Sequence, residues 1–328
     1  MSILILGGAG FVGLNLAEAF LAKGRHVTVF DRSPPPPSAC QAFERLPGRF
    51  EAVSGDVTDA AALGGVIVSG VDTLVLGAAV TAGAERDARE PRTVLAVNLA
   101  SQVPALELAR DAGVRRVVNL SSAAAYGAAG QREARLDETV PADPVGLYAV
   151  TKFASERVAA RLGALWGMDV VSLRLSGVFG PWERATGWRD TLSPHLQAAS
   201  LAEAGAPAFL GRPGLRDWIY APDVAEAVVR VVEADRLAYP VYNVSAPERW
   251  SVLEWGRLLE TAHPGFTCRL ARDGEAPTID LHGPDRAPLG TGRLAAELGW
   301  TARFGMASSA EHYIAWRKAH RSLNEDHA

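Results

Sequence analysis

Short apolar runs alternate with longer amphipathic stretches through the first half of the chain. Ile3–Leu6 is a continuous apolar run, typical of a strand covered on both faces. The further strand candidates are His26–Phe30, Glu51–Val53, Thr73–Leu76, Arg116–Leu120 and Val170–Arg174. The helical candidates between the strands are Phe11–Lys23, Asp59–Ser69, Arg92–Ala112 and Leu147–Trp166. This order predicts an α/β fold, a doubly wound parallel sheet of Rossmann type with helices on both faces.

After about Arg174 the pattern loosens into short helices, isolated strands and Gly/Pro-rich turns. A chain of 328 residues has room for about two domains. We expect residues 1–173, with returning elements near 218–245, to form the Rossmann domain. Residues 174–217 and 246–320 are expected to form a smaller C-terminal substrate lobe, and 321–328 a polar tail. Four prolines at 34–37 predict an exposed loop, because proline cannot continue a strand or helix.

Charge and composition exclude several classes of protein. Lys plus Arg (33) against Asp plus Glu (37) gives a net charge of −4, which leaves no broad basic field for nucleic acid. We find no apolar run long enough for a spanning helix, so no membrane partner is expected. Cys40 and Cys268 cannot make a disulfide scaffold or a structural zinc site, so we expect no metal and predict a cytoplasmic location.

A glycine-rich turn joins the first strand to the first helix. Glycines at 7, 10 and 13 let the backbone turn tightly, approach a pyrophosphate and pack helix against strand. The helix begins near Phe11 and Val12, where unpaired N–H groups can bind phosphate. The position of this motif between a strand and a helix predicts dinucleotide binding.

Asp31 ends the second strand, 18 residues after Gly13. A carboxylate at this place accepts hydrogen bonds from the ribose hydroxyls of the adenosine and repels a 2′-phosphate, so NAD is favoured over NADP. Arg32 is the opposing signal, because a guanidinium could pair with that phosphate. We therefore include Arg32 with Asp31 among the candidate cofactor contacts.

Two more strand ends supply candidate cofactor contacts. Asp56 and Val57 follow the third strand, where a loop could touch adenine. Ala78 and Ala79 follow the fourth, where small residues would let the cofactor lie close to the backbone. The carboxyl ends of parallel strands are the usual place for ligands in doubly wound folds.

Tyr148 and Lys152 begin the strongest predicted helix, four residues apart and therefore on one face. An unperturbed tyrosine has a pKa of ~10, too high for a base near neutrality. We expect the nearby ammonium to lower that pKa and make the pair a general acid/base. Ser122, directly after the strand Arg116–Leu120, is placed to hydrogen-bond the reacting oxygen and pass a proton to Tyr148.

In combination these motifs resemble an extended short-chain dehydrogenase/reductase of the NAD-dependent epimerase/dehydratase family, along almost the whole chain. The resemblance implies hydride transfer to NAD, with Tyr148 as base, Lys152 as its electrostatic support and Ser122 as proton shuttle. It also implies a cofactor contact at Asn98 and a sugar-type substrate. It further implies a homodimer through helices near Arg92–Ala112 and Leu147–Trp166.

Arg216 resembles the arginine that holds the diphosphate in nucleotide-sugar epimerases, although an architectural ion pair with Asp217 is also open. Ser176 is a second candidate substrate contact, with a short side chain that implies an atypical contact. Nucleotide-sugar 4,6-dehydratases carry Asp-Glu straight after the shuttle residue, where this chain has Ala123 and Ala124. Since alanine cannot move a proton, dehydration is disfavoured.

The leading hypothesis is therefore an NAD-dependent epimerase of a nucleotide-linked or similar sugar, working through a transient keto intermediate. One alternative is an NAD-dependent dehydrogenase of a free sugar, sugar acid or polyol. Another is a non-catalytic NAD-binding regulatory protein, which intact Ser122, Tyr148 and Lys152 disfavour. Trp182, Trp188 and His195 could line a sugar pocket, but packing is the more ordinary role of such residues.

Overall fold

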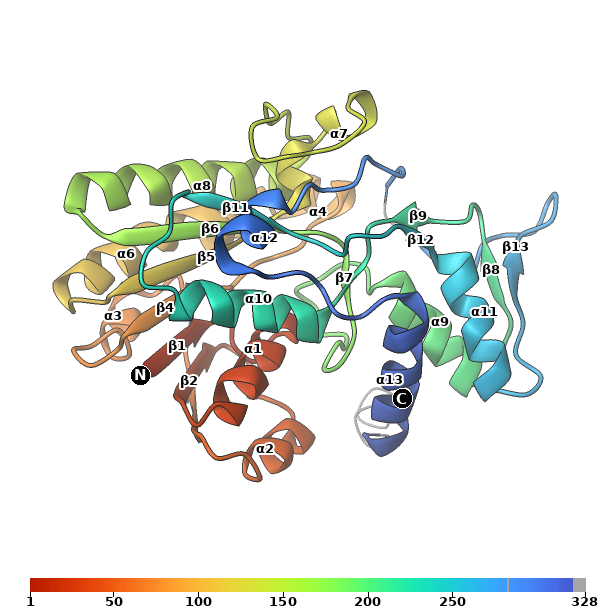
Figure 1. The fold of residues 1–328 in the computed structure, drawn as a ribbon, viewed down its shortest axis with the longest axis horizontal. Coiled ribbons are helices and arrows are strands. Elements are labelled where there is room, and N and C mark those ends of the chain that lie inside the picture. The colour runs from red at the N-terminus through yellow and green to blue at the C-terminus, as the bar shows by residue number, and fades with distance from the viewer. Residues whose placement is uncertain (282, 321–328) are drawn as a thin grey trace.

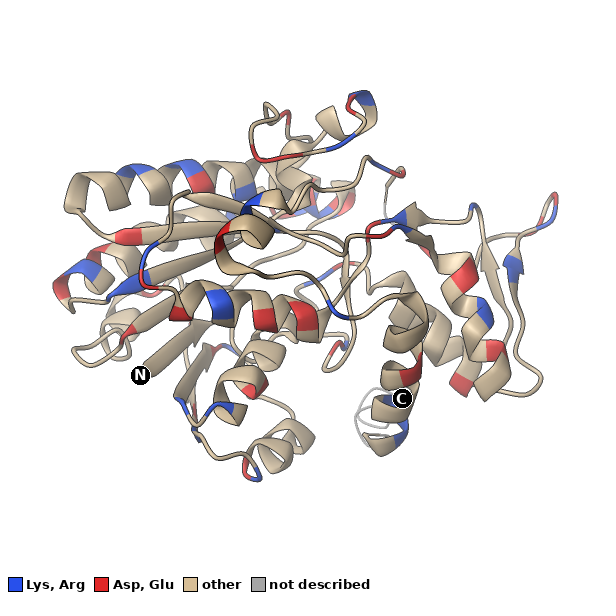
Figure 2. Cartoon of the chain, viewed as in Figure 1, with Lys and Arg blue, Asp and Glu red and all other residues tan. Residues whose placement is uncertain are grey.

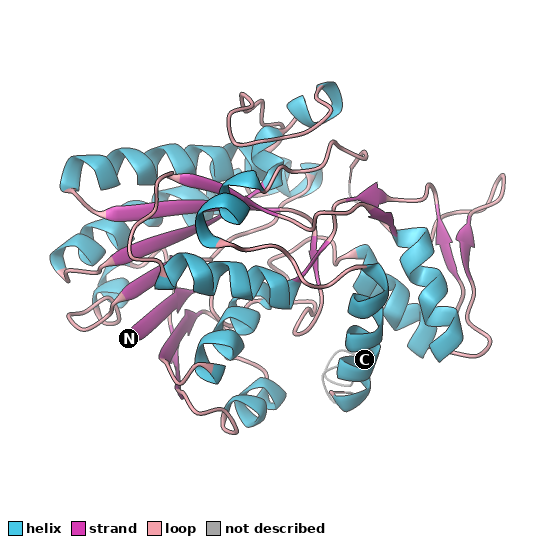
Figure 3. Ribbon diagram, in the orientation of Figure 1, coloured by secondary structure: helices cyan, strands magenta, loops and turns pink. Residues whose placement is uncertain are grey.

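The computed structural model describes residues 1–281 and 283–320 and centres on a seven-stranded sheet (Figures 1 and 3). The strand order is β11-β6-β5-β4-β1-β2-β3, and every neighbouring pair is parallel. The strands are β1 (Ser2–Leu6), β2 (His26–Asp31), β3 (Arg49–Ser54), β4 (Thr73–Leu76), β5 (Arg116–Ser122), β6 (Asp169–Leu175) and β11 (Val241–Val244). The predicted doubly wound sheet is confirmed, while the predicted tail at 321–328 lies outside the described residues.

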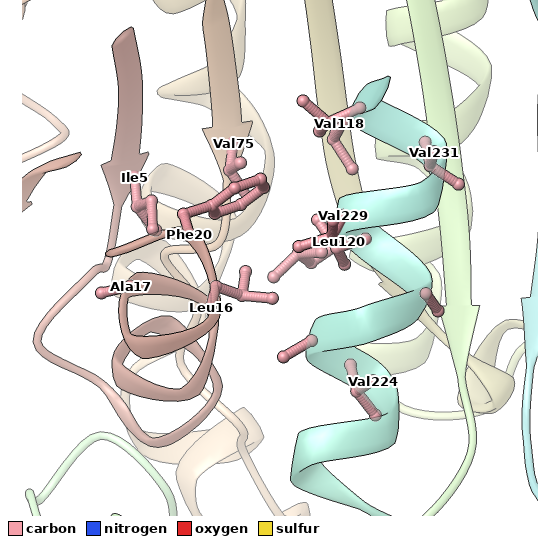
Figure 4. Packing of buried hydrophobic residues seen from close by; sticks show 14 of the residues in the cluster. Ile5, Leu16, Ala17, Phe20, Val75, Val118, Leu120, Val224, Val229 and Val231 are labelled. Atoms are coloured by element: carbon pink, nitrogen blue, oxygen red, sulfur yellow. The ribbon is translucent and has the colours of Figure 1, made fainter. Parts of the chain in front are cut away.

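Helices cover both faces of this sheet. One layer contains α1 (Phe11–Ala22) and α10 (Ala221–Glu233), and the other contains α3 (Ala60–Gly64), α6 (Gln102–Asp111) and α8 (Leu147–Trp166). Successive strand residues point to opposite faces, so Ile5 packs in the first layer and Leu6 in the second. Figure 4 shows Phe20 of α1 and Val229 of α10 in the first layer. Unbroken apolar strands are therefore buried on both sides, as the sequence pattern predicts.

The proline run ends in a helix that the sequence pattern missed. Pro37 is the first residue of α2 (Pro37–Phe43), which packs Ala39 and Phe43 against the first layer. Proline is well tolerated at this first position, because its missing N–H would have no partner within the helix anyway. The prolines before it form the loop, and Pro37 starts the helix.

The single helix predicted over Arg92–Ala112 is broken. The chain forms α5 (Pro91–Leu95), a π-helical turn over Ala96–Ala100, and then α6. Pro104 lies in the first turn of α6 and has no N–H to donate to the carbonyl four residues earlier. Loss of that hydrogen bond gives a physical reason for the irregular turn just before it.

The elements after β6, other than α10 and β11, form a second group beside the sheet (Figure 1). Its helices are α9 (Pro194–Glu203), α11 (Val252–Ala262) and α13 (Met306–Ala319), with α12 (Gly292–Leu298) packed back toward the main sheet. Its short strands pair as β7 (Val178–Phe179) with β10 (Ile219–Tyr220), β9 (Leu215–Arg216) with β12 (Trp250–Ser251), and β8 (Ala208–Leu210) with β13 (Cys268–Leu270). Aromatic residues such as Trp255 and Tyr313 dominate a separate buried cluster here.

The remaining short helices are α4 (Ala84–Arg89) and α7 (Ala129–Arg132), with a 3₁₀ turn over Ala123–Tyr126 after β5. Acidic and basic residues are interspersed over both groups of elements in this view (Figure 2). None of the helices in the described part of the chain is both long and apolar enough to cross a bilayer.

Candidate active site

A cavity of about 920 Å³ opens at the carboxyl ends of the sheet strands. It lies where the strand order reverses, between β1 and β4, the usual ligand site of a doubly wound sheet. Residues that follow β1, β2, β4 and β5 form one part of its wall, and residues after β6 form the rest. The predicted site residues that line it are Gly7, Gly10, Phe11, Val12, Gly13, Asp31, Arg32, Asp56, Val57, Ala78, Ala79, Ser122, Tyr148, Lys152, Ser176 and Arg216.

The glycine turn has no space for side chains. Gly7 has a φ of +74°, and a Cβ there would lie 2.6 Å from the Cα of Ala78. A Cβ on Gly13 would lie 2.6 Å from the carbonyl oxygen of Gly7. The turn thus leads directly into α1, whose first N–H groups lack partners within the helix and can bind an anion. These residues fit the pyrophosphate of a dinucleotide.

Asp31 stands beside this turn at the end of β2. Its carboxylate accepts hydrogen bonds from the backbone N–H of Ala9 (3.1 Å) and of Ser33 (3.2 Å). Burial raises the pKa of Asp31, and these hydrogen bonds and the Arg184 cation oppose that rise. Arg32, the opposing signal in the sequence, pairs instead with Asp56, at 3.6 Å, and lies 4.7 Å from the ring centroid of Trp188.

We expect Asp31→Asn to weaken the preference for NAD over NADP, because it keeps an acceptor but removes the negative charge that repels a 2′-phosphate. Titration of the variant with NADH and with NADPH measures both dissociation constants. Their ratio is expected to move toward NADPH by about tenfold, equivalent to ~1.4 kcal/mol. An unchanged ratio would contradict the role of Asp31 at the ribose.

Asn98 is the one predicted cofactor contact that does not line the cavity. Its side chain is completely buried and bonds the backbone of Val80, accepting from its N–H at 2.7 Å and donating to its carbonyl at 3.0 Å. It also donates to the hydroxyl of Thr151 at 3.2 Å. The implied direct contact is therefore corrected: Asn98 shapes the loop after β4 and joins it to α8.

Ser122, Tyr148 and Lys152 meet on one side of the cavity. Ser122 ends β5, and its hydroxyl accepts a hydrogen bond from the N–H of Ala124 at 3.1 Å. Tyr148 and Lys152 lie in the first turns of α8, and the Lys152 Nζ is 5.9 Å from the centroid of the Tyr148 ring. The helix spacing therefore places the phenol and the ammonium on the same face, as predicted.

The sequence predicts that Lys152 lowers the pKa of Tyr148, but in the structure this pKa is raised. Burial raises the pKa of Tyr148, while hydrogen bonds with the Ser122 and Thr81 side chains and the positive charge of Arg189 lower it. The Lys152 ammonium instead donates to the Leu120 carbonyl at 2.8 Å. The sequence could not show this, because it does not reveal how much water reaches the phenol.

Lys152 is itself almost completely buried. Burial lowers its pKa to about 8, and the Glu156 carboxylate one turn further along α8 opposes that change. The side chain therefore carries its positive charge at neutral pH. In this form it can support a phenolate on Tyr148 or hydrogen-bond a ribose hydroxyl.

A buried polar network fixes the end of β5 behind Ser122, Tyr148 and Lys152. The Ser121 hydroxyl donates to Glu156, which also pairs with Arg174 at 2.6 Å. Glu156 and Arg174 are each at most about one-twentieth exposed. Because Ser121 directly precedes Ser122, this network holds the shuttle residue in place against α8.

Two arginines from segments that follow β6, Arg216 and Arg286, also line the cavity. Arg216 donates to the Pro284 carbonyl at 3.0 Å and lies over the Trp218 ring. Burial and the neighbouring Arg286 cation lower the pKa of Arg216 to about 10. The Asp217 and Asp285 carboxylates oppose that change. Arg216 lines the cavity, and its guanidinium has the geometry to bind a phosphate group there.

Ser176 supports this pair of arginines. Its hydroxyl accepts a hydrogen bond from Arg286 at 2.7 Å and donates to the Asp217 carbonyl at 2.6 Å. Arg286 also pairs with the Asp217 carboxylate at 3.0 Å. The architectural ion pair considered for Arg216 is thus formed by Arg286, and Ser176 lines the cavity with its hydroxyl engaged by protein groups.

A comparison with known families agrees with this geometry. The model of the NAD dependent epimerase/dehydratase family matches residues 3–245. The chain belongs to this family. The family consists of NAD-dependent enzymes of the extended short-chain dehydrogenase/reductase class, and solved structures similar to this chain contain NAD.

Relatives in the epimerase/dehydratase family differ in the reaction that they are named for. The dTDP-glucose 4,6-dehydratase of Xanthomonas campestris pv. campestris (strain B100) is 24% identical over 95% of this chain and 92% of its own. The probable UDP-glucuronate 4-epimerase of Rhizobium meliloti (strain 1021) is 28% identical over 70% of this chain and 68% of its own. The structure of MoeE5 in complex with UDP-glucuronic acid and NAD has a TM-score of 0.77 and 25% identity, and covers 97% of this chain and 99% of that one.

Several wall residues of the family site were absent from the sequence prediction. Thr81, Gln131, Arg184, Arg189 and Arg286 all line the cavity. They belong to loops, or for Gln131 to the four-residue helix α7, that carry no glycine motif and no long helical pattern, so no local signal distinguishes them from surface residues. Of the three aromatic candidates, Trp188 lines the cavity, whereas Trp182 and His195 are buried in packing clusters.

Burial of His195 makes the stability of the fold depend on pH in the acid range. Its ring stacks on Phe179 with centroids 3.8 Å apart, between the edges of Trp218 and Trp255, and neither ring nitrogen has a partner among the described residues. Burial lowers the pKa of His195 well below 6.5. As the pH falls below ~6.5, the unfolded chain binds a proton that the folded chain does not, so stability falls.

We expect His195→Phe to remove this contribution. The free energy of unfolding of the variant should rise relative to the unsubstituted protein by up to about 1.4 kcal/mol for each pH unit below ~6.5. Urea unfolding of both proteins between pH 7 and pH 5 measures the difference. Two parallel pH profiles would contradict the account.

Proposed function

We propose that this protein is an NAD-dependent epimerase of a nucleotide-linked sugar. One observation carries the proposal. The proposed proton-transfer residues Ser122, Tyr148 and Lys152 line the same cavity as two neighbouring cations, Arg216 and Arg286. A ligand that spans the cavity can present a carbinol to the first group and a diphosphate to the second. A nucleotide sugar has both features in one molecule.

The chemistry follows from the side chains. Tyr148 removes the proton of the sugar hydroxyl, Ser122 holds the same oxygen, and the positive charge of Lys152 stabilises the resulting phenolate. NAD, when bound, would accept the hydride from the carbinol carbon and return it. The sugar would transiently be a ketone, and Tyr148 would give its proton back to the oxygen as the hydride returns to the other face and inverts the carbon.

The residues after Ser122 distinguish this reaction from dehydration. Ala123 and Ala124 both line the cavity, and neither side chain can donate or accept a proton. Loss of water from the sugar needs an acid and a base near the adjacent carbons. We therefore propose epimerisation, although dehydratases are among the relatives.

Product analysis tests this proposal. The purified protein is incubated separately with UDP-glucuronic acid, UDP-glucose and dTDP-glucose, and the products are separated by anion-exchange chromatography while the absorbance of reduced nicotinamide is followed. Conversion of one sugar to its epimer without accumulation of NADH supports the proposal. Stoichiometric NADH would identify a dehydrogenase, a keto-deoxy sugar would identify a dehydratase, and either result would overturn it.

We also propose a homodimer through α5, α6 and α8. Leu95, Val103 and Val150 on these helices are each more than one-third exposed. Burying such side chains between two copies would be favourable. Light scattering after gel filtration is expected to give twice the 34.7 kDa chain mass, and Val150→Glu to give the monomer. An unsubstituted protein that elutes as a monomer would contradict the dimer.

The remaining proposals concern domain division and location. We propose that the aromatic cluster around α9, α11 and α13 is the core of the substrate lobe, with the division at about residue 174. We propose the cytoplasm as the location, and the unpaired state of Cys40 and Cys268 supports a reducing compartment.

A further inference from the structure

The segment 183–191, here called the strap, crosses from the substrate side to the cofactor side of the cavity. It follows β7, and six of its residues besides Glu183 line the cavity: Arg184, Thr186, Trp188, Arg189, Asp190 and Thr191. Its backbone is joined to the loop after β4. The Thr81 N–H donates to the Trp188 carbonyl at 2.8 Å, and the Asp190 N–H donates to the Thr81 carbonyl at 3.1 Å.

Side chains anchor the strap at both ends. Asp190 pairs with Arg86 at 3.1 Å and accepts from the Gly83 N–H at 2.8 Å. At the other end, Glu183 is buried and accepts from the Ser193 N–H at 2.7 Å. Glu183 therefore closes the base of the strap, Asp190 holds it to the segment after β4, and moving it breaks several polar contacts together.

Arg184 reaches from the strap to the glycine turn. One terminal nitrogen donates to the Ala9 carbonyl at 2.8 Å, and the other, Nη1, is buried without a hydrogen-bond partner among the described residues. Burial lowers the pKa of Arg184, and the Asp31 carboxylate opposes that change. A desolvated guanidinium with one unsatisfied donor, beside the glycine turn, is well placed to bind an anion such as a phosphate.

Trp188 lies over the adenosine end of the same site. The guanidinium of Arg32 stacks on its ring at 4.7 Å and pairs with Asp56 at 3.6 Å. Arg32 directly follows Asp31, the proposed ribose ligand, so the Trp188–Arg32 stack covers the place where the adenosine would lie. The strap thereby contacts the glycine turn after β1 through Arg184 and the end of β2 through Trp188.

We propose that the strap retains the dinucleotide between turnovers, with Arg184 binding its pyrophosphate and Trp188, stacked on Arg32, closing its adenosine end. Cofactor release then requires the strap to leave Thr81 and Ala9. The inference depends on the NAD site and is independent of which sugar is the substrate. Retention by the strap would let an enzyme that returns the hydride to its sugar use one cofactor molecule for many turnovers.

Dissociation of NADH tests the strap without any substrate. NADH-loaded protein is mixed with excess NAD, and the loss of NADH fluorescence gives the dissociation rate. Trp188→Ala and Arg184→Gln are each expected to raise this rate about tenfold or more. The first substitution uncovers the adenosine end, and the second removes a charged hydrogen bond to the pyrophosphate. Trp166→Ala and Arg110→Gln are matched controls, because Arg110 stacks on Trp166 at 4.8 Å away from the cavity.

A second measurement separates ligand contact from general loosening of the fold. Arg184→Gln is expected to weaken binding of ADP-ribose, which carries the pyrophosphate, and to leave binding of adenosine unchanged. Trp188→Ala is expected to weaken both. Arg184→Lys should recover part of the ADP-ribose affinity. Rates and affinities equal to those of the controls would overturn the proposal, as would equal losses for adenosine and ADP-ribose in Arg184→Gln.

Discussion

Tyr148→Phe is expected to lower the turnover number by about 10²- to 10⁴-fold, the usual contribution of general acid–base catalysis. The substitution removes only the phenolic oxygen, which lies at the cavity wall where the Ser122 and Thr81 side chains lower the pKa of Tyr148. The ring stays, so the packing of the first turn of α8 is kept. No other described side chain combines this position with a proton that it can exchange and a supporting ammonium four residues away.

Turnover and cofactor binding are measured on the same preparation. NADH affinity of Tyr148→Phe is expected to stay within a fewfold of the unsubstituted protein, because the glycine turn and Asp31 are untouched. Tyr239→Phe is the matched control, since Tyr239 is 42% exposed and does not line the cavity. Turnover of Tyr148→Phe comparable to that of the control would exclude Tyr148 as the acid/base.

Arg116→Leu is expected to cost about 3–5 kcal/mol of unfolding free energy. Arg116 is fully buried, and its guanidinium donates to the Val231 carbonyl, to the Ala234 carbonyl at 2.7 Å and to Asp169 at 2.8 Å. The last carbonyls of a helix have no partner within it, so Arg116 satisfies the end of α10. Leucine fills part of the space but leaves the Val231 and Ala234 carbonyls without this donor.

Urea unfolding of both proteins measures this loss. Arg110→Leu is the control, because Arg110 forms an exposed pair with Asp111 on α6, and such pairs contribute ~0–1 kcal/mol. Arg116 lies at the opposite end of β5 from Ser122, so any folded Arg116→Leu protein should keep its NADH affinity. A loss below about 1 kcal/mol would contradict the assigned role.

The main sheet and the cofactor wall could be predicted because their signals are local. Apolar strands buried on both faces, such as Ile3–Leu6, and glycines that must accept close backbone contacts, such as Gly7, are set within a few residues of sequence. The pattern over Leu147–Trp166 predicts the bounds that α8 has, because this pattern is long. In the structure Gly167, in the left-handed conformation, ends the helix.

The rest of the site depends on contacts between distant segments. Arg184 meets Ala9 across 175 residues, and Arg286 meets Ser176 across 110. Neither pairing has a periodicity that a single sequence reveals. Asn98 was assigned to the cofactor by resemblance, but burial directs its amide to Val80. The pKa of Tyr148 was mispredicted for the same reason, because burial depends on loops that fold over from elsewhere.

Isotope transfer tests most directly whether the hydride returns from the cofactor to the sugar carbon that it left. Each nucleotide sugar of the product screen is prepared with deuterium on the carbon whose configuration changes, and the enzyme carries unlabelled NAD. The account predicts that the epimeric product keeps its deuterium at that carbon, and that none appears in released NADH. Deuterium lost to solvent or recovered in free reduced cofactor would contradict it.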